Sequence, residues 1–186
     1  MLKYNLIAAV CQNGGIGKNN DLPWTLKKDT KYFNEITSIT ACEGKKNVVL
    51  MGRKTWESFP FHLKPFSNRF NFVLSRSNLN FEMYENVFVF HSWDDVYERL
   101  QDPKFQKLYD KIWILGGSDI YKVALGSKHF YRLYLTEINK DYDCDTFFPS
   151  FSNVKLVSDP LVPNGIQEEN GVTYEFKVYE NELFKG

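Results

Sequence analysis

The sequence has few cysteines, no excess of charge of either sign and no long apolar run. Its three cysteines, Cys11, Cys42 and Cys144, are odd in number and form no CxxC spacing, so they indicate neither a disulfide framework nor a zinc site. Lysine plus arginine and aspartate plus glutamate both total 23, so the net charge is zero and nothing indicates a nucleic-acid or membrane surface. No stretch has the length of a membrane span or a secretory signal. We therefore expect a cytoplasmic protein.

The chain also lacks repeats, low-complexity segments and linkers. Its 186 residues are enough for one compact domain and few for two. Hydrophobic residues make up 43% and aromatic residues 17%, which is typical of a folded protein with a full core. We expect one domain over residues 1–186 and, because no long apolar seam favours obligate assembly, a monomer.

The N-terminal part has the pattern of a strand, a loop and a helix. Leu6–Val10 is a continuous apolar run, which is typical of a strand buried on both faces. Residues 11–20 contain three glycines and several turn formers, and therefore predict a loop. After this loop the apolar residues follow helical spacing, with Leu26, Phe33 and Ile36 expected to face inward.

Asp29 lies on this helical stripe, at positions i, i+4 and i+7 with Phe33 and Ile36. The neighbouring lysines stand one or two positions away and so do not share its face. A buried carboxylate without a partner is costly, so an inward Asp29 needs a donor from another element or from a ligand. The alternative is a rotated helix in which Asp29 is a solvated side chain, the usual state of a helical aspartate.

Apolar strands alternate with helix starts through the middle of the chain. Each strand ends in small or basic residues, a pattern that predicts a mainly parallel sheet with helices on both faces. These strands are Asn47–Met51, Phe70–Leu74, Val87–Phe90 and Ile112–Leu115. The last third differs, because Phe130–Ile138 is a further strand and Val172–Tyr179 alternates strictly, as a half-exposed antiparallel edge strand would.

Hydroxyl and cationic residues follow the ends of the predicted parallel strands. In open α/β sheets ligands bind outside the carboxyl ends of the strands, where helix N-termini present free N–H groups. The residues expected along this edge are Arg53, Lys54, Thr55, Ser75, Arg76, His91, Ser92, Gly116, Gly117 and Ser118. Such a set suits a ligand with several phosphates. The alternative is that Thr55, Ser92 and Ser118 are plain helix caps and the cations are solvated, which is less credible for the whole set.

Three other motifs are incomplete. Residues 52–55 resemble the end of a Walker A loop, but the first glycine is missing because position 48 is Val48. The Gly116–Gly117 pair lacks the full GxGxxG fingerprint of a dinucleotide-binding Rossmann domain. The alternating aspartates 141, 143 and 145 lack the glycine and the glutamate of a calcium loop. We therefore expect no kinase, no ordinary Rossmann domain and no metal site.

A series of motifs extends over nearly the whole chain. They are Asn13–Trp24, Asp29, Phe33, Met51–Ser58, Arg69, Leu74–Arg76, Ile114–Ser118, Tyr121, Thr136 and Asp145–Pro149. In this order and at this spacing they resemble dihydrofolate reductases of the animal type, and the number of motifs in register makes the resemblance highly specific. The resemblance implies a single α/β domain with a central, mainly parallel eight-stranded sheet, an antiparallel C-terminal strand and helices on both faces.

The resemblance also implies a substrate site around Asp29. In the family this carboxylate binds the 2-amino group and N3 of the pterin, with the Thr136 hydroxyl behind it, and the arginine at position 69 binds the carboxylate of the glutamate tail. The matching catalytic residues are Asp29, Trp24, Leu22 and Thr136, and the matching substrate-binding residues are Ile7, Ala8, Asp29, Phe33, Phe59, Pro60, Arg69, Leu115 and Tyr121. Most of the apolar members would be core in any case.

The implied cofactor is NADPH. The matching residues are Ala9, Ile16, Gly17, Arg53, Lys54, Thr55, Ser58, Leu74, Ser75, Arg76, His91, Ser92, Gly116, Gly117, Ser118, Asp119 and Ile120, with an adenosine-binding subdomain over about 47–105. Arg53 and Arg76 match the residues that hold the 2′-phosphate, whereas His91 departs from the arginine of close relatives. A cis peptide is expected between Gly116 and Gly117, and the loop 13–21 is the expected lid.

The implied activity is NADPH-dependent reduction of 7,8-dihydrofolate to tetrahydrofolate, which supplies one-carbon metabolism and thymidylate synthesis. Two alternatives remain from the residues themselves. One is a binding module that holds folate or nucleotide without turnover, and the other is a related reductase that acts on a tail-less pterin or pyrimidine. Arg69 discriminates against the second, because a substrate without a carboxylate tail has no use for it. His62 and His129 belong to no group of catalytic or ligand-binding residues and are expected at the surface.

Overall fold

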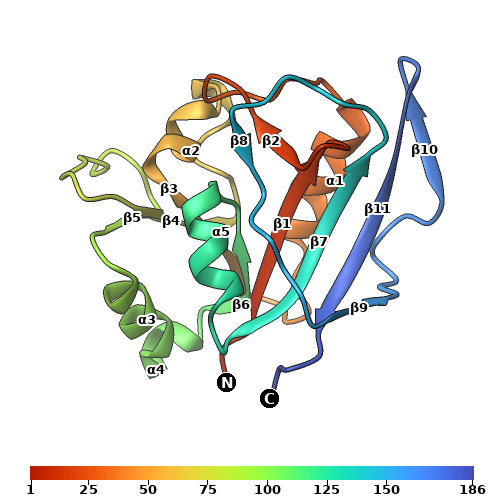
Figure 1. Ribbon diagram of the computed structural model, residues 1–186. Helices are drawn as coiled ribbons and strands as arrows, with labels where there is room; N and C mark the ends of the chain where they lie inside the picture. Colours follow the sequence, from red (N-terminus) through yellow and green to blue (C-terminus); the bar gives the residue numbers. More distant parts are fainter.

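The computed structural model describes all residues from Met1 to Gly186. A central twisted sheet carries helices on both faces (Figure 1). Its strands are β1 (Tyr4–Val10), β3 (Lys46–Gly52), β4 (Arg69–Leu74), β5 (Val87–Phe90), β6 (Tyr109–Ile114), β7 (Phe130–Ile138), β9 (Val154–Val157), β10 (Ile166–Glu169) and β11 (Val172–Asn181). A separate two-stranded sheet joins β2 (Gly15–Gly17) to β8 (Thr146–Phe147).

The helices are α1 (Lys27–Ser38), α2 (Arg53–Ser58), α3 (Trp93–Gln101), α4 (Pro103–Gln106) and α5 (Ser118–Leu125), with a single 3-10 turn at Phe61–Leu63. Eight strands follow the order β10-β11-β7-β1-β6-β3-β4-β5, and β9 is a ninth that pairs with β11. The strands from β7 to β5 pair in parallel, whereas β11 runs antiparallel to β7. The predicted fold class is therefore confirmed.

The prediction that β11 is an edge strand was wrong. One side of β11 pairs with β7, and its other side pairs with β10 near the start and with β9 near the end. The alternation that suggested an edge reflects one buried and one partly solvated face, with Tyr174, Phe176 and Val178 buried. Face exposure and edge position are separate properties of a strand, and residue alternation reports only the first.

The continuous apolar runs are explained by a hydrophobic core on each face of the sheet. Successive side chains of a strand point to opposite faces. In β3, Val48 and Leu50 pack in the core that includes residues of α3, α4 and α5, whereas Val49 and Met51 pack in the core that includes residues of α1 and α2. A strand with helices on both faces therefore has no polar face.

Helix α1 buries its predicted face and is capped from a distant strand. Ile36 is buried and Phe33 half-buried, as expected, and Tyr32 is also buried. The N-cap residue Leu26 has no side chain that accepts a hydrogen bond, so Glu169 of β10 takes this role. Its carboxylate accepts from the backbone N–H groups of Lys27 at 2.7 Å and Lys28 at 3.1 Å. A carboxylate at this end of a helix also suits the helix dipole.

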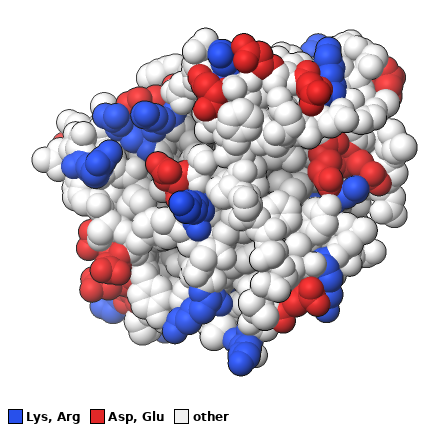
Figure 2. Space-filling model, in the orientation of Figure 1, with Lys and Arg blue, Asp and Glu red and all other residues white.

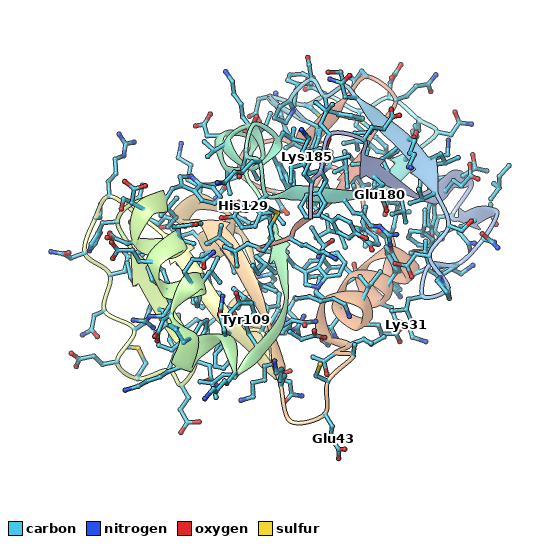
Figure 3. All side chains as sticks on the ribbon, turned by 90° about the horizontal axis from the view of Figure 1, so that it is seen from below. Lys31, Glu43, Tyr109, His129, Glu180 and Lys185 are labelled. Carbon is cyan, nitrogen blue, oxygen red and sulfur yellow. The ribbon has the colours of Figure 1, made fainter.

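The alternative interpretation of Thr55, Ser92 and Ser118 as helix caps holds for Ser92 alone, which accepts from the Asp95 N–H at 3.1 Å; the N-caps of α2 and α5 are Gly52 and Gly117. The expectation that His129 lies at the surface was wrong. His129 (Figure 3) is only 7% exposed, because its ring packs against Tyr4 and Tyr97. His62 is exposed, as predicted.

The two-core arrangement predicts which leucines of the sheet hold the fold together. Leu50 of β3 is 1% exposed, whereas Leu156 of β9 is 63% exposed. Leu50→Ala should lower the free energy of unfolding by about 2–5 kcal/mol, because it leaves a cavity between packed layers. Leu156→Ala should change it by less than about 0.5 kcal/mol. Urea unfolding of both variants measures the difference, and similar losses would contradict this account of the core.

Candidate active site

The carboxyl ends of three central strands meet at the top of the sheet as drawn in Figure 1. β6 lies between β1 and β3, with Ile114 in register with both Leu6 and Leu50. Just beyond β6, the Leu115 N–H donates to the Leu50 carbonyl at 2.8 Å, and the Gly52 N–H donates to the Gly116 carbonyl at 2.9 Å. The predicted convergence of the glycine pair and the start of α2 is thus present.

Asp29 faces inward, as its place on the α1 stripe indicates. The Thr136 hydroxyl of β7 donates to its Oδ1 at 2.6 Å, across 107 residues of sequence. Thr136 is buried and pairs in register with Ala9 of β1, so the carboxylate lies beside the end of β1. No lysine or arginine forms an ion pair with Asp29. The solvated alternative is therefore wrong, since the carboxylate is half-buried beside a strand.

Burial raises the pKa of Asp29 to about 6. The hydrogen bond from Thr136 acts in the opposite direction because it stabilises the ionised form, and the nearby Glu169 carboxylate adds to the rise. Glu169 thus caps α1 and also raises the pKa of the helix's inward carboxylate. A carboxyl group whose pKa lies this close to neutral pH, and which has no cationic partner, is typical of a functional site.

Arg69 is a second charge without a counter-charge. Its side chain is 2% exposed, and its guanidinium donates to the Ser67 carbonyl, the Thr37 hydroxyl and the Asn34 amide oxygen at 2.8–2.9 Å. None of these partners is a carboxylate, and burial lowers the pKa of Arg69 to about 10. Buried arginines are normally paired with an anion, so this position fits the anionic end of a ligand.

Helix α1 sets the separation of the two charges. Asn34 and Thr37, which hold Arg69, follow Asp29 on the same helix by five and eight residues. A rise of about 1.5 Å per residue places them about 7–12 Å further along the axis. Between them lies an aromatic cluster in which Phe33, Phe59 and Phe66 have ring centroids 4.9–6.4 Å apart. The site therefore suits a flat ligand with donors at one end and a carboxylate at the other.

Trp24 and Leu22 lie just before α1 in the chain. Trp24 is 6% exposed, packs edge-on against Tyr142 at 5.3 Å, and has a buried Nε1–H without a hydrogen-bond partner. Leu22 is 53% exposed and so is available for contact with a ligand. An unpaired buried donor usually has a water or ligand partner.

The Gly116–Gly117 peptide bond is cis, as predicted. Gly116 has a φ of +111°, and a Cβ there would lie 3.0 Å from the ring of Tyr121. The Tyr121 hydroxyl donates to the Ile7 carbonyl at 2.6 Å and lies 2.9 Å from the Leu115 carbonyl, which ties the middle of β1 to the residue after β6. Only glycine fits this approach of the backbone to the tyrosine.

Comparison with known proteins agrees with this geometry. A family model described as dihydrofolate reductase matches residues 3–181. The chain belongs to the dihydrofolate reductase family. It is 44% identical over 180 residues to the dihydrofolate reductase of Bos taurus, covering 95% of this chain and 96% of that one. It is 40% identical over 182 residues to that of Aedes albopictus, covering 97% and 98%.

A solved structure gives the same result. The dihydrofolate reductase of Schistosoma mansoni superposes with a TM-score of 0.86 at 37% identity, covering 97% of this chain and 98% of that one. The resemblance to the animal type is therefore confirmed. The chain is an oxidoreductase that reduces dihydrofolate to tetrahydrofolate with a nicotinamide cofactor. None of its helices is long and apolar enough to cross a membrane.

The residues expected to contact phosphate in this reductase lie on the side of α2 and β4, where Figure 2 shows a group of basic side chains. Arg76 is exposed and has no carboxylate partner, whereas Arg53 lies 3.8 Å from Glu57 one helical turn away. His91 Nδ1 lies 2.8 Å from the Ser75 carbonyl, which fixes the imidazole over the end of β4. The structure therefore brings this predicted group together.

The other expected cofactor residues follow the same edge. Ile120 of α5 packs over Gly52, and Ser118 donates to the Phe147 carbonyl at 2.8 Å, so its hydroxyl is already used within the protein. Ser58 likewise donates to the Thr55 carbonyl. The remaining members are Ala9 at the end of β1, Ile16 and Gly17 in β2, Lys54 in α2, Leu74 at the end of β4, Ser92 before α3 and Asp119 in the first turn of α5.

The remaining expected substrate residues are Ala8 and Pro60. Ala8 lies on β1, and Pro60 is exposed before the 3-10 turn.

Sequence reasoning assigned no role to four residues of this site. Glu169 influences Asp29, Asn34 and Thr37 hold Arg69, and Tyr142 packs on Trp24. Only Asn34 and Thr37 left a signal, because polar residues five and eight positions after Asp29 interrupt the apolar pattern of α1. The other two belong to segments more than 100 residues away.

The raised pKa of Asp29 predicts that this residue costs stability at neutral pH. Since its pKa in the folded protein, about 6, exceeds the 3.8 of a solvated aspartate, the folded state resists ionisation. Asp29→Asn should therefore raise the free energy of unfolding at pH 7.5 by about 1–3 kcal/mol, and the gain should disappear as pH falls through 6 towards 4.

Urea unfolding at pH 7.5 and pH 4 measures this effect. Asp141→Asn, at an exposed position, serves as the matched control and should change stability by less than about 0.5 kcal/mol at either pH. An equal gain at both pH values for Asp29→Asn would show that ionisation of Asp29 is not its cause.

Proposed function

We propose that this reductase is a cytoplasmic monomer that uses NADPH to reduce 7,8-dihydrofolate at C6 and N5. The observation that carries the proposal is the pair of uncompensated charges on one site wall, the half-buried Asp29 carboxylate and the buried Arg69 guanidinium. The reduced nicotinamide supplies the hydride when bound, and the protein supplies orientation, charge and exclusion of water. The product would serve one-carbon metabolism and thymidylate synthesis.

Asp29 orients the substrate ring. A carboxylate has room for more acceptor contacts than the one Thr136 occupies, and the amidine-like edge of a pterin offers two parallel N–H donors to it. Arg69 binds the carboxylate of the glutamate tail at the other end. The residues proposed to line the ring between them are Ile7, Ala8, Phe33, Phe59, Pro60, Leu115 and Tyr121.

Asp29 promotes protonation without delivering the proton itself. While it holds the amino edge of the ring it cannot reach N5, so its role is electrostatic: an ionised carboxylate raises the basicity of N5. Water delivers the proton. The unpaired Nε1–H of Trp24 supports this role, because it is a donor suited to hold that water near Leu22.

The glycine pair and the basic edge support a phosphorylated dinucleotide. Gly116 and Gly117 present backbone without Cβ atoms at the start of α5, where a pyrophosphate can approach N–H groups. Arg53 and Arg76 would hold the 2′-phosphate. For His91, the contact of Nδ1 with the Ser75 carbonyl leaves Nε2 as the nitrogen free to face that phosphate.

The other residues proposed to contact the cofactor are Ala9, Ile16, Gly17, Lys54, Thr55, Ser58, Leu74, Ser75, Ser92, Ser118, Asp119 and Ile120, and residues 47–105 would form the adenosine-binding subdomain. The loop 13–21 would close over the nicotinamide. Its middle part, Gly15–Gly17, pairs with β8 as strand β2, so the loop already has a docking partner. We propose no nucleic-acid partner and no metal.

Loss of the Asp29 charge should impair turnover. Asp29→Asn should lower kcat for dihydrofolate at neutral pH by about 100-fold or more, the scale usual for a group that governs proton transfer. The loss of NADPH absorbance measures this rate, with Asp141→Asn as the control that keeps its activity. Near-normal turnover of Asp29→Asn would remove Asp29 from the mechanism.

Arg76 should discriminate between the two nicotinamide cofactors. Arg76→Gln removes an exposed guanidinium with no internal partner, so the fold should be unaffected. We expect KM for NADPH to rise about 10-fold, the loss of one charge-assisted contact, while KM for NADH stays the same because NADH lacks the 2′-phosphate. Steady-state kinetics with both cofactors provide the test, and an equal rise for both would place Arg76 outside the 2′-phosphate site.

A further inference from the structure

Two of the three cysteines lie side by side next to the proposed lid. Cys11 directly follows β1 and is 3% exposed, and Cys144 lies in the segment before β8 and is half-buried. Their sulfur atoms are 3.9 Å apart, although 133 residues separate them in the sequence. Cys42 is exposed, and no sulfur contact joins it to this pair. Two thiols in contact can be oxidised to a disulfide within the chain, whereas the isolated Cys42 thiol cannot.

Gly15 makes the contact of the two sulfurs possible. A Cβ at that position would overlap the Cys144 sulfur, so only glycine permits this packing. On its other side the Cys11 thiol donates to the Asn13 amide oxygen at 2.8 Å. A disulfide requires the sulfurs to approach to about 2.05 Å, and the Cys11 thiol then gives up its hydrogen bond to Asn13.

The two cysteines lie on two segments that contact each other only non-covalently. Figure 1 draws the loop after β1 and the segment before β8 next to each other at the top of the molecule. Asn13 donates to the Tyr142 carbonyl at 3.0 Å, and Lys18 lies 3.3 Å from Asp143. The Asp145 N–H donates to the Gly17 carbonyl at 2.9 Å. Each of these contacts can break and re-form as the loop moves.

We propose that Cys11 and Cys144 form an oxidisable dithiol, whose disulfide fastens the loop 11–21 to the segment before β8 and thereby slows turnover. The modification itself goes beyond the proposed function, and its effect on turnover rests on the lid role assigned there. A lid that must open and close in each cycle is slowed by a covalent tie at its base. No histidine or carboxylate completes a metal site with the two sulfurs.

The chemistry is thiol–disulfide exchange with a small-molecule disulfide such as glutathione disulfide. The more exposed Cys144 thiolate attacks it, one sulfur–sulfur bond breaks, and the first glutathione leaves as a thiolate that takes up a proton. Cys11 then attacks the Cys144 sulfur and displaces the second glutathione. The two protein thiols lose two electrons and two protons, and glutathione disulfide becomes two glutathione thiols.

Oxidation of the pair would be slow. Burial raises the pKa of the Cys144 thiol, and its contact with Cys11 acts in the same direction. The thiolate is therefore scarce at neutral pH and exchange is slow. The pair would respond to sustained oxidation rather than to the ordinary reducing conditions of a cytoplasm.

The test uses the full chain carrying Cys42→Ser, which leaves only the two adjacent thiols. After incubation with glutathione disulfide we expect a mass lower by two hydrogen atoms, no retained glutathione, and a non-reduced digest in which a peptide with Cys11 is linked to one with Cys144. The matched control, Cys42→Ser with Cys144→Ser, should form no such link. Two free thiols, or stable glutathione adducts, under conditions that modify Cys42 in the unaltered chain would overturn the proposal.

Two further measurements test the consequence of the bond. Hydrogen exchange of residues 13–21 should slow in the oxidised Cys42→Ser protein, and kcat should fall several-fold and recover with dithiothreitol. Unchanged exchange and turnover in the fully cross-linked protein would overturn the link between the disulfide and the lid. A reduced protein that fails to turn over dihydrofolate would contradict the proposed function. It would not affect the disulfide proposal, which the peptide mapping tests independently.

Discussion

A single hydrogen bond, from the hydroxyl of Thr136 to the carboxylate of Asp29, is the interaction on which the site depends. It joins α1 to the central sheet and directs a carboxylate towards the end of β1. Because no cation neutralises this carboxylate, burial raises its pKa instead. The remote Glu169 both begins the helix and strengthens that shift. Helix position and carboxylate chemistry are therefore set by the same contacts.

Arg69 complements Asp29 at the other end of the aromatic cluster. Each is a charge removed from water without an opposite charge within the protein, an arrangement that costs stability in the free protein. A ligand that supplies both missing partners would recover that cost on binding, because it binds the folded state alone. The neutral overall charge of the chain agrees with recognition through these local charges rather than through a broad field.

The close packing of the loop 11–21 has two consequences. The lack of a Cβ on Gly15 lets this loop lie close against the segment before β8 and makes room for the Cys144 sulfur. The close approach that docks the loop is also what brings two thiols into contact. Loop closure and thiol chemistry would consequently be linked by geometry.

The sequence by itself determined the fold class and the main strands, and it placed Asp29 on the buried stripe of its helix, because hydrophobic periodicity records which face of each element is buried. It also indicated the convergence of glycine and basic residues at one edge, since parallel strands all end on the same side. Only the tertiary structure decided that Glu169 caps α1, that β9 and β10 flank β11, that His129 is buried and that Cys11 meets Cys144. The physical reason is that burial leaves a local pattern along the chain, whereas the identity of a partner more than 100 residues away depends on how whole elements pack together.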